Sequence, residues 1–327
     1  MPAGAPPPVF SLVIPAHNAV RYLGEALDSV FDENTRHPYE VIVVDDGSVD
    51  GTAALASTYP GVVCLRQENT GPSAARNAGI AAAKAGIVLF LDADDKVLPG
   101  RFDLELDQMR AEPEVAVTFG NWIVEGEPGD YLARYGLPPA PERFRELDNP
   151  FGRLMTAGCC VPTSTVAVRK TWLERVGGFP EDRRYAEDYA VWLKIAAAGG
   201  RFAYSSRALA WYRKGAASSL TRSSHTHAGL VLTLREALLS CGARLSVAER
   251  AVAEARYRTA VNGLLRHEWA YRGRRAALDR AQSLEPLIPR DLAITYRLLT
   301  LLPGGLPRLL RETMRARGRL ALRGAGR

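Results

Sequence analysis

Apolar and polar residues follow one another in blocks along the first hundred residues of the chain. Four apolar runs lack regular polar positions, which is typical of strands buried on both faces of a parallel sheet. These runs cover residues 9–16, 39–48, 61–68 and 86–95. Segments with helical spacing separate them and cover residues 18–31, 49–59 and 71–85. This alternation predicts an α/β domain with a Rossmann-like, mostly parallel sheet flanked by helices.

The same pattern extends to about residue 224 and then changes. A helix and a strand are expected between residues 101 and 120, followed by a Pro- and Gly-rich loop over 125–150. Further strands and helices are expected at residues 163–179, 185–200 and 201–214. After residue 224 the patterning is helical throughout. We therefore predict a disordered lead (1–8), a main domain (9–224) and an Arg-rich helical C-terminal region (225–327).

Charge is distributed unevenly between these regions. Residues 225–327 contain 19 Arg, no Lys and 8 acidic residues, a net charge of +11, whereas residues 1–224 have a net charge of −5. The basic region has three open interpretations: it contacts an anionic membrane surface, it packs on a partner, or it is solvated. Its Arg residues follow no recognisable nucleic-acid-binding module, so we expect no nucleic acid partner.

Signals for targeting and for disulfides are missing from the sequence. The N-terminus has no basic segment followed by an apolar one, and no apolar run approaches the ~20 residues of a membrane-spanning helix. The four cysteines show no metal-ligand spacing, which favours free thiols in a reducing compartment. We predict a cytoplasmic protein, peripheral at the inner face of the membrane if the basic region binds lipid.

Three carboxylates, Asp92, Asp94 and Asp95, end the fourth predicted strand segment, directly after its apolar residues 87–91. In parallel α/β sheets, ligands bind outside the carboxyl ends of the strands. Carboxylates this close repel one another and raise each other's pKa unless a cation lies between them. Hard oxygen ligands suit Mg²⁺ or Mn²⁺, and Mg²⁺ often binds through one or two carboxylates and substrate phosphates. We favour such a metal–phosphate site over a solvated turn that caps a helix.

Three other segments contain candidate residues, each with a structural alternative. Asp46 ends the second strand and is placed to accept hydrogen bonds from a base or ribose, within a segment that also forms a turn and a helix cap. Arg76, alone among Ala and Gly, is expected to face the acids or a diphosphate, or else the solvent. Glu187 and Asp188 begin a helix, whose N-terminus favours acids in any case, and they could supply a general base. Dinucleotide-binding and P-loop motifs are missing.

These segments and their order along the chain resemble the sequence motifs of the family 2 glycosyltransferases, which have the GT-A fold. The matching pieces are VIPAHN, VVDDGSVDGT, GPSAARNAG, FLDADD, VGGF and AEDYAVWLKIAAAGG. The resemblance covers roughly residues 9–215 and implies a nucleotide-binding half over about 9–120 and an acceptor half over about 121–224. It implies inverting transfer of a sugar from a nucleoside diphosphate donor, usually a UDP-sugar, with Mn²⁺ or Mg²⁺ at the diphosphate.

The resemblance also implies roles for individual residues. Asp188 would be the general base that takes the proton of the acceptor hydroxyl, and Glu187 would help to orient the acceptor. Asp94 and Asp95 would contact the metal ion. The residues implied in binding the nucleotide-sugar are Pro15, Ala16, Asn18, Asp46, Arg76, Asp92, Asp94 and Arg213. The acceptor would be a glycan, a lipid-linked glycan or a small molecule, and the enzyme a hexosyltransferase.

Two departures and two alternatives accompany this resemblance. Ala190 stands where the family often has another acidic residue, and the loop after Arg213 lacks the family's frequent His. The string LFLDADDKV also fits a haloacid-dehalogenase-like phosphatase, with Asp92 as nucleophile and Asp94 as acid/base. The other alternative is a non-catalytic protein that binds nucleotide sugars or glycans.

Overall fold

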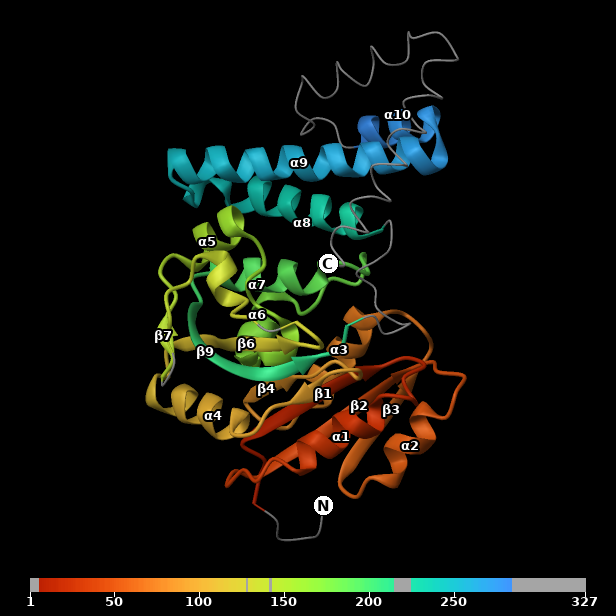
Figure 1. The fold of residues 1–327 in the computed structure, drawn as a ribbon, viewed down its shortest axis with the longest axis vertical. Helices are drawn as coiled ribbons and strands as arrows, with labels where there is room; N and C mark the ends of the chain where they lie inside the picture. The colour runs from red at the N-terminus through yellow and green to blue at the C-terminus, as the bar shows by residue number, and fades with distance from the viewer. Residues whose placement is uncertain (1–5, 128, 141–142, 215–224, 284–327) are drawn as a thin grey trace. The chain divides into compact units, whose positions relative to one another are not determined.

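A mixed β-sheet forms the centre of residues 1–221, the first of the two units into which the chain divides (Figure 1). The computed structural model describes residues 6–127, 129–140, 143–214 and 225–283. Within these residues the strands are β1 (Phe10–Ala16), β2 (Tyr39–Asp46), β3 (Val62–Gln67), β4 (Ile87–Phe90), β5 (Lys96–Val97), β6 (Val115–Val124), β7 (Arg145–Glu146), β8 (Ala167–Arg169) and β9 (Arg201–Tyr212). Their order is β3-β2-β1-β4-β8-β6-β9-β5, and β7 pairs with β9.

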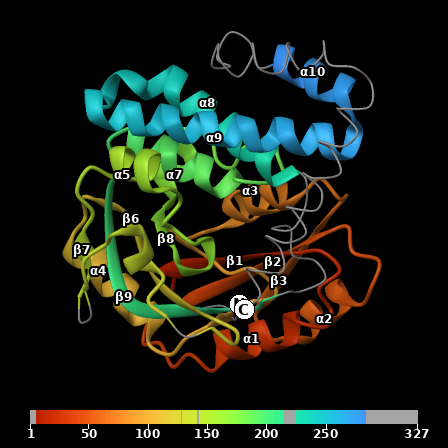
Figure 2. The same ribbon diagram turned by 45° about the horizontal axis from the view of Figure 1, so that its top comes forward.

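Helices cover both faces of this sheet, as the α/β prediction requires (Figure 2). They are α1 (Leu23–Phe31), α2 (Thr52–Thr58), α3 (Pro72–Ala82), α4 (Arg101–Ala111), α5 (Pro150–Ala157), α6 (Lys170–Val176) and α7 (Glu187–Ala197). Two 3₁₀ turns, Leu132–Tyr135 and Thr163–Thr165, complete the unit. Helices α1 and α2 lie on one face of the sheet, and α3 and α7 lie on the other.

The first half of the sheet is parallel, which confirms the prediction for this part. β1 pairs in parallel with β2 and β4, and β2 pairs in parallel with β3. Leu12 and Ile14 pack with Leu23 and Leu27 of α1 in one fully buried cluster. Burial on both faces is wrong for β3, because this strand lies at the sheet edge and leaves Val63 39% exposed.

The second half of the sheet is mixed rather than parallel. β8 runs antiparallel to both β4 and β6, whereas β9 runs parallel to β6. The short strands β5 and β7 both pair antiparallel with β9. An apolar run identifies a buried strand but does not encode its direction, so the sequence pattern could not show this change.

Helix α3 approaches the sheet closely because its facing side chains are small. A Cβ atom at Gly79 would lie only 2.3 Å from Cγ1 of Val13 on β1. Ala75 and Gly79 are both buried along this contact. The prediction that small residues allow this helix to pack tightly on the sheet is confirmed. The close approach brings Arg76, on the same helix, near the carboxyl ends of the strands.

The predicted loop over 125–150 contains short pieces of regular structure, the 3₁₀ turn Leu132–Tyr135 and the strand β7.

The second unit, residues 222–327, is helical where the structure describes it, as predicted. Its helices are α8 (His225–Cys241), α9 (Val247–Arg272) and α10 (Arg274–Ser283). Ser246 and Glu249 form a capping box at the start of α9. Residues 284–327 of the Arg-rich C-terminal region lie outside the described residues. None of the described helices has both the length and the hydropathy to span a bilayer.

Replacement of Gly79 by Ala is expected to lower the free energy of unfolding by about 1–2 kcal/mol. Overpacking against Val13 costs about 1–3 kcal/mol, and the gain in helix propensity returns up to about 1 kcal/mol. Urea denaturation followed by tryptophan fluorescence measures the change. Gly86→Ala is the matched control, because Gly86 is exposed and a Cβ there would meet no atom within 4 Å. Equal effects of the two substitutions would show that α3 does not depend on this close contact.

Candidate functional site

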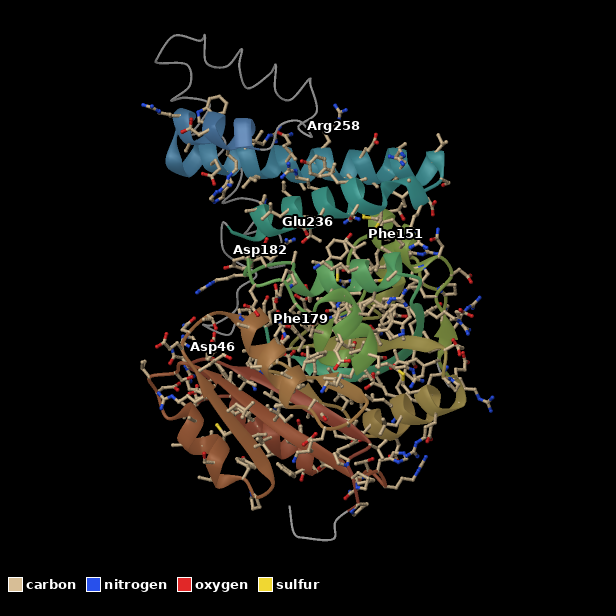
Figure 3. All side chains as sticks on the ribbon, turned by 180° about the vertical axis from the view of Figure 1, so that it is seen from behind. Asp46, Phe151, Phe179, Asp182, Glu236 and Arg258 are labelled. Atoms are coloured by element: carbon tan, nitrogen blue, oxygen red, sulfur yellow. The ribbon has the colours of Figure 1, made fainter. Side chains whose placement is uncertain are left out.

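The carboxyl ends of β1, β2 and β4 lie at one edge of the sheet, and polar residues follow each of them. The parallel register places Ala16 of β1 beside Asp45 of β2. Pro15 and Ala16 therefore end β1 next to the end of β2, where Asp46 stands, and Asp92 follows β4. Figure 3 shows Asp46 at this edge of the sheet. Candidates from three separate segments thus share one side of the domain.

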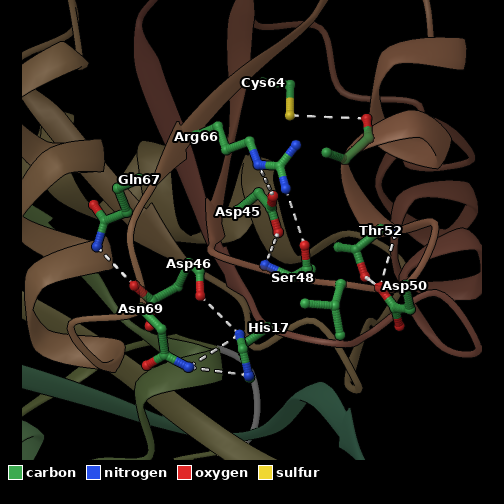
Figure 4. A network of polar contacts seen from close by, with 12 residues as sticks. His17, Asp45, Asp46, Ser48, Asp50, Thr52, Cys64, Arg66, Gln67 and Asn69 are labelled. Carbon is green, nitrogen blue, oxygen red and sulfur yellow. Dashed lines mark hydrogen bonds and ion pairs between the residues drawn. The ribbon is translucent and has the colours of Figure 1, made fainter.

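Both carboxylate oxygens of Asp46 accept hydrogen bonds from the end of β3 and the segment that follows it. Figure 4 shows the bond from Gln67. Oδ1 accepts from Gln67 Nε2 at 2.8 Å and from the Thr70 amide at 2.9 Å, and Oδ2 accepts from the Gly71 amide at 2.8 Å. Nδ1 of His17 lies 2.7 Å from the Asp46 carbonyl oxygen. A carboxylate has about four lone-pair sites. The Thr70 hydroxyl also lies 3.5 Å from Oδ1, so Oδ1 is fully used. Asp46 therefore orders this segment, and only Oδ2, with one donor, has capacity for another.

Asn18 links the segments that follow β1 and β2. Its backbone amide donates to Oγ of Ser48 at 2.9 Å, and its side-chain Oδ1 accepts from the Val49 backbone amide at 3.0 Å. Both contacts join segments about 30 residues apart in sequence, so the structure gives Asn18 a scaffolding position at the carboxyl ends of β1 and β2. His17 and Asn69, which were not predicted as site residues, face each other here, with Asn69 Nδ2 3.1 Å from His17 Nε2. As polar loop residues they have no distinguishing sequence signal.

The acidic turn after β4 combines burial with repulsion between its carboxylates. Asp95 accepts hydrogen bonds from the Ser164 hydroxyl at 2.6 Å and from the Arg213 amide at 3.1 Å. Burial, and then repulsion from Asp92, raises the pKa of Asp94 to about 6. Burial also raises the pKa of Asp95 well above its ordinary value, with Asp92 and Asp94 adding to the effect. The ionised forms of Asp94 and Asp95 are therefore disfavoured in this turn.

A divalent cation would favour the ionised forms of Asp94 and Asp95. Positive charge beside Asp94 and Asp95 would lower the pKa of both carboxyl groups. No three His, Cys, Asp or Glu side chains within the described ranges are grouped as a ready metal cage. Mg²⁺ seldom uses such a cage, because it keeps several waters and binds through one or two carboxylates and substrate phosphates. Asp94 and Asp95 fit an ion of this kind.

Arg213, at the end of β9, lies against the acidic turn. Its Nε donates to the Asp94 carbonyl oxygen at 3.2 Å, and its Nη2 donates to Glu25 at 2.9 Å. The guanidinium carbon is 4.8 Å from the ring centre of Trp211 and 4.9 Å from that of Tyr22. These contacts fix one positive charge beside the predicted metal ligands. The loop over 215–224 lies outside the described residues.

Arg76 is buried between two carboxylates that are distant in sequence. Its Nη2 is 2.8 Å from Asp92 Oδ1, and its Nη1 is 2.8 Å from Glu187 Oε1. Its guanidinium carbon lies 5.3 Å from the ring centre of Phe179, which is labelled in Figure 3. Burial alone would lower the pKa of Arg76, but Asp92 and Glu187 outweigh it and raise the pKa. Arg76 faces the acids, and the solvent-facing alternative is wrong.

Asn77 of α3 holds the loop after α6, which contains Phe179. Asn77 Nδ2 donates to the Phe179 carbonyl at 2.8 Å, and Asn77 Oδ1 accepts from the Phe179 amide at 2.8 Å. Gly178 has a φ of +68°, and a Cβ there would lie 2.6 Å from Asn77 Oδ1. Glycine suits both constraints. Asn77, next to Arg76 in sequence, therefore fixes the backbone of the residue whose ring packs against the guanidinium.

Glu187 and Asp188 form the first turn of α7, so the explanation by the helix N-terminus also holds. Asp188 Oδ1 accepts from the Tyr189 amide at 2.6 Å, and Oδ2 accepts from Oγ1 of Thr163 at 3.1 Å. Burial raises the pKa of Asp188, while Arg76 lowers it. Burial, and then repulsion from Asp188, raises the pKa of Glu187 to about 7. Both groups therefore titrate nearer to neutral pH than free carboxyl groups do, which suits general-base chemistry.

The structure gathers most of the predicted residues around these contacts. The residues joined through direct contacts or through shared neighbours are Arg76, Asp92, Asp94, Asp95, Glu187, Asp188 and Arg213. Pro15, Ala16, Asn18 and Asp46 form the adjoining part of the same edge. Ala190, where the family often has an acid, is buried within α7. Thr163 and Ser164 were missed, because hydroxyl groups in a turn carry no sequence signature.

Comparison with known families and proteins agrees with the predicted family and fold. The family model described as glycosyl transferase family 2 matches residues 11–175. TuaG of Bacillus subtilis (strain 168), described as a teichuronic acid biosynthesis glycosyltransferase, is 29% identical over 212 residues, 63% of this chain and 79% of that protein. An uncharacterized glycosyltransferase of Rickettsia prowazekii (strain Madrid E) is 27% identical over 192 residues, 58% of each chain. The chain thus spans little more than half the length of that relative.

Solved structures of S. aureus TarS are similar to this chain in fold. TarS 1–349 in complex with UDP-GlcNAc has a TM-score of 0.64 and 19% identity, over 94% of this chain and 87% of that one. The complex with UDP has a TM-score of 0.61, over 94% of this chain and 91% of that one. The similarity confirms the predicted GT-A fold. These matches give no support to the haloacid-dehalogenase-like alternative.

Replacement of Arg76 by Met is expected to lower the free energy of unfolding by about 3–5 kcal/mol, because it leaves the buried carboxylate of Glu187 and the partly exposed one of Asp92 without their cation. Arg36→Met is the matched control. Arg36 also bridges two carboxylates, Asp103 and Asp107, but it is 61% exposed, so its loss should cost at most about 1 kcal/mol. Urea denaturation compares the two variants. Equal losses would contradict a special role for the buried bridge.

Proposed function

Because the chain belongs to glycosyl transferase family 2, we propose that it transfers a sugar from a nucleoside diphosphate sugar to an acceptor hydroxyl, with inversion at the anomeric carbon. The proposal rests above all on one observation. Arg76 joins Asp92, which follows β4, to Glu187, which begins α7, at 2.8 Å on each side. The acidic turn of the donor side and the carboxylate of Asp188 are therefore parts of one site.

The donor in this proposal is a UDP-sugar. S. aureus TarS, which shares the fold, has been solved with UDP-GlcNAc and with UDP, and this supports the choice of nucleotide. Asp46, His17 and Asn69 offer polar groups to the base at the edge of the sheet. Asp94 and Asp95 would hold Mn²⁺ or Mg²⁺, and the bound ion supplies positive charge to the diphosphate.

Asp188 is the general base of the proposed reaction. Its carboxylate takes the proton of the acceptor hydroxyl while that oxygen forms a bond to the anomeric carbon. The bond between the anomeric carbon and the diphosphate oxygen breaks on the opposite face, and its electron pair leaves with the nucleoside diphosphate. A single displacement of this kind inverts the configuration. Arg213, held against the acidic turn, offsets the charge that develops on the leaving group.

The acceptor in this proposal is a glycan, free or lipid-linked. The description of TuaG as a teichuronic acid biosynthesis glycosyltransferase supports this class over a small molecule. A cytoplasmic location stays a prediction. A contact of the basic C-terminal region with the membrane is also a prediction, because residues 303–327 lie outside the described chain. Co-sedimentation with anionic liposomes, with and without these residues, decides the membrane contact.

The substitution Asp188→Asn should abolish most transfer and spare donor binding. The amide cannot take a proton, so the rate should fall by about 10²–10⁴-fold. Asparagine keeps the size of the side chain and an oxygen for the Thr163 hydroxyl. Release of UDP from UDP-sugars, measured with a panel of glycan acceptors, gives the rate, and calorimetry with UDP and Mn²⁺ gives binding.

Asp107→Asn controls for the loss of one carboxylate, because Asp107 lies on the exposed face of α4 in contact with Arg36. It should leave the rate unchanged. Full activity of the Asp188 variant would assign the base elsewhere. A wild-type protein that binds UDP-sugars but transfers no sugar to any acceptor would favour the non-catalytic alternative.

Nucleotide binding should stabilise the protein, and Mn²⁺ should increase the effect. A ligand at 100 times its Kd adds about 2.7 kcal/mol to the free energy of unfolding. UDP, dTDP and GDP are compared by thermal shift, with and without Mn²⁺, and UDP is expected to give the largest shift. Asp94→Asn should remove the part that depends on Mn²⁺, whereas Asp107→Asn should retain it. No stabilisation by any of the three nucleotides would contradict the proposed donor class.

A further inference from the structure

A single 3₁₀ turn, Thr163–Thr165, contacts both sides of the proposed site. Oγ1 of Thr163 donates to Oδ2 of Asp188 at 3.1 Å, and Oγ of Ser164 donates to Oδ2 of Asp95 at 2.6 Å. The two hydroxyl residues are neighbours in sequence and are both 5% exposed. Two carboxylates that are far apart in the chain are thus held by consecutive residues.

The turn itself is fixed to the sheet. Ser164 Oγ also accepts from the Asp92 amide at 3.1 Å, so its hydroxyl is both donor and acceptor. The Thr165 amide and its hydroxyl both donate to the Pro162 carbonyl, each at 2.9 Å. The next residues enter β8, which pairs with β4. The Ser164 hydroxyl both donates and accepts a hydrogen bond, and its turn leads directly into the central sheet. The hydroxyl therefore has little freedom to move.

We propose that Thr163 and Ser164 are positioning residues, which set the separation between the proton-accepting carboxylate of Asp188 and the cation-binding carboxylate of Asp95. The inference rests on the proposed function. Consecutive Cα atoms are 3.8 Å apart. Neither carboxylate can therefore move away from the other without breaking a hydrogen bond to the turn. The acceptor oxygen and the diphosphate must fit between them, so the turn fixes the span of the reacting groups.

The hydrogen bond from Thr163 also acts on the titration of Asp188. The other charged or titratable groups that face Asp188 are Arg76 from α3, Asp92 after β4, Glu187 on α7 and Cys159 before the turn. Burial raises the pKa of Asp188, and Asp92 adds to this effect. Arg76, the Tyr189 amide and Thr163 lower the pKa. Burial and Asp188 raise the pKa of the Cys159 thiol well above its usual value, so this thiol stays neutral.

The sign of the effect follows from the state that the hydrogen bond stabilises. Thr163 donates to the carboxylate and so favours the ionised form. Without this hydroxyl the pKa of Asp188 rises, and the base is protonated over a wider range of acidic pH. The acid limb of the pH profile of kcat/KM, which reports the free enzyme, must then move to higher pH.

Thr163→Val tests the first half of the proposal. The acid limb should move up by about one pH unit. Thr163→Ser should restore it, because the hydroxyl returns. Thr156→Val is the matched control, since the Thr156 hydroxyl donates only to backbone carbonyl groups of α5. If Thr163→Val does not fold, Thr163→Ala removes the same hydroxyl and takes its place.

Ser164→Ala tests the second half by a reading that is independent of activity. The affinity for Mn²⁺ in the presence of UDP, measured from the free-ion signal by electron paramagnetic resonance, should fall about tenfold. The acid limb of the kcat/KM profile of the Ser164→Ala variant should not move. Thr163→Val should leave the affinity for Mn²⁺ unchanged. Ser57→Ala, which removes an exposed hydroxyl on α2, controls for the substitution.

The outcomes separate this inference from the proposed function. An active wild-type enzyme whose variants show neither the limb shift nor the loss of Mn²⁺ affinity overturns the positioning role alone. A wild-type protein that transfers no sugar overturns the proposed function and this inference with it. Separate responses, one confined to the pH profile and the other to Mn²⁺ affinity, support the inference.

Discussion

The buried bridge from Arg76 to Asp92 and Glu187 is the interaction on which the site depends. Arg76 and Glu187 are 111 residues apart in sequence, yet their charged groups meet at 2.8 Å. Breaking a buried ion pair costs far more than breaking an exposed one. The bridge therefore fixes α7, with Asp188, relative to the strand end that leads into the acidic turn. Phe179, clamped by Asn77, holds the guanidinium from one side.

This bridge leaves the site with more acids than cations. Two Arg side chains, Arg76 and Arg213, lie among five carboxylates, those of Asp92, Asp94, Asp95, Glu187 and Asp188. The imbalance and the burial together raise the pKa of four of them. The same imbalance serves both sides of the proposed reaction. It favours a divalent cation at the acidic turn and a carboxylate with enough basicity to accept a proton near α7.

The sequence predicts those features that local patterns determine. Apolar runs located β1, β2 and β4, and the carboxyl ends of these strands located Asp46 and the acidic turn. The antiparallel direction of β8 and the position of β3 at the sheet edge depend on pairing between distant segments, which no local pattern contains. The small neighbours of Arg76 favoured its inward orientation, but they left a solvent-facing side chain as the alternative. Thr163 and Ser164 could not be found in this way, since their partners lie 25 and 69 residues away.

The way in which Asp95 and Asp188 are held explains how the site can accept a charged donor. The groups that donate hydrogen bonds to these two carboxylates are neutral, the hydroxyls of Thr163 and Ser164 and the backbone amides of Tyr189 and Arg213. Neutral donors fix orientation without cancelling the negative charge. That charge stays available to a cation on one side and to a proton on the other. In the proposed reaction, a diphosphate beside the acidic turn would be repelled unless a cation came with it, so the proposal couples donor binding to cation binding at this edge of the sheet.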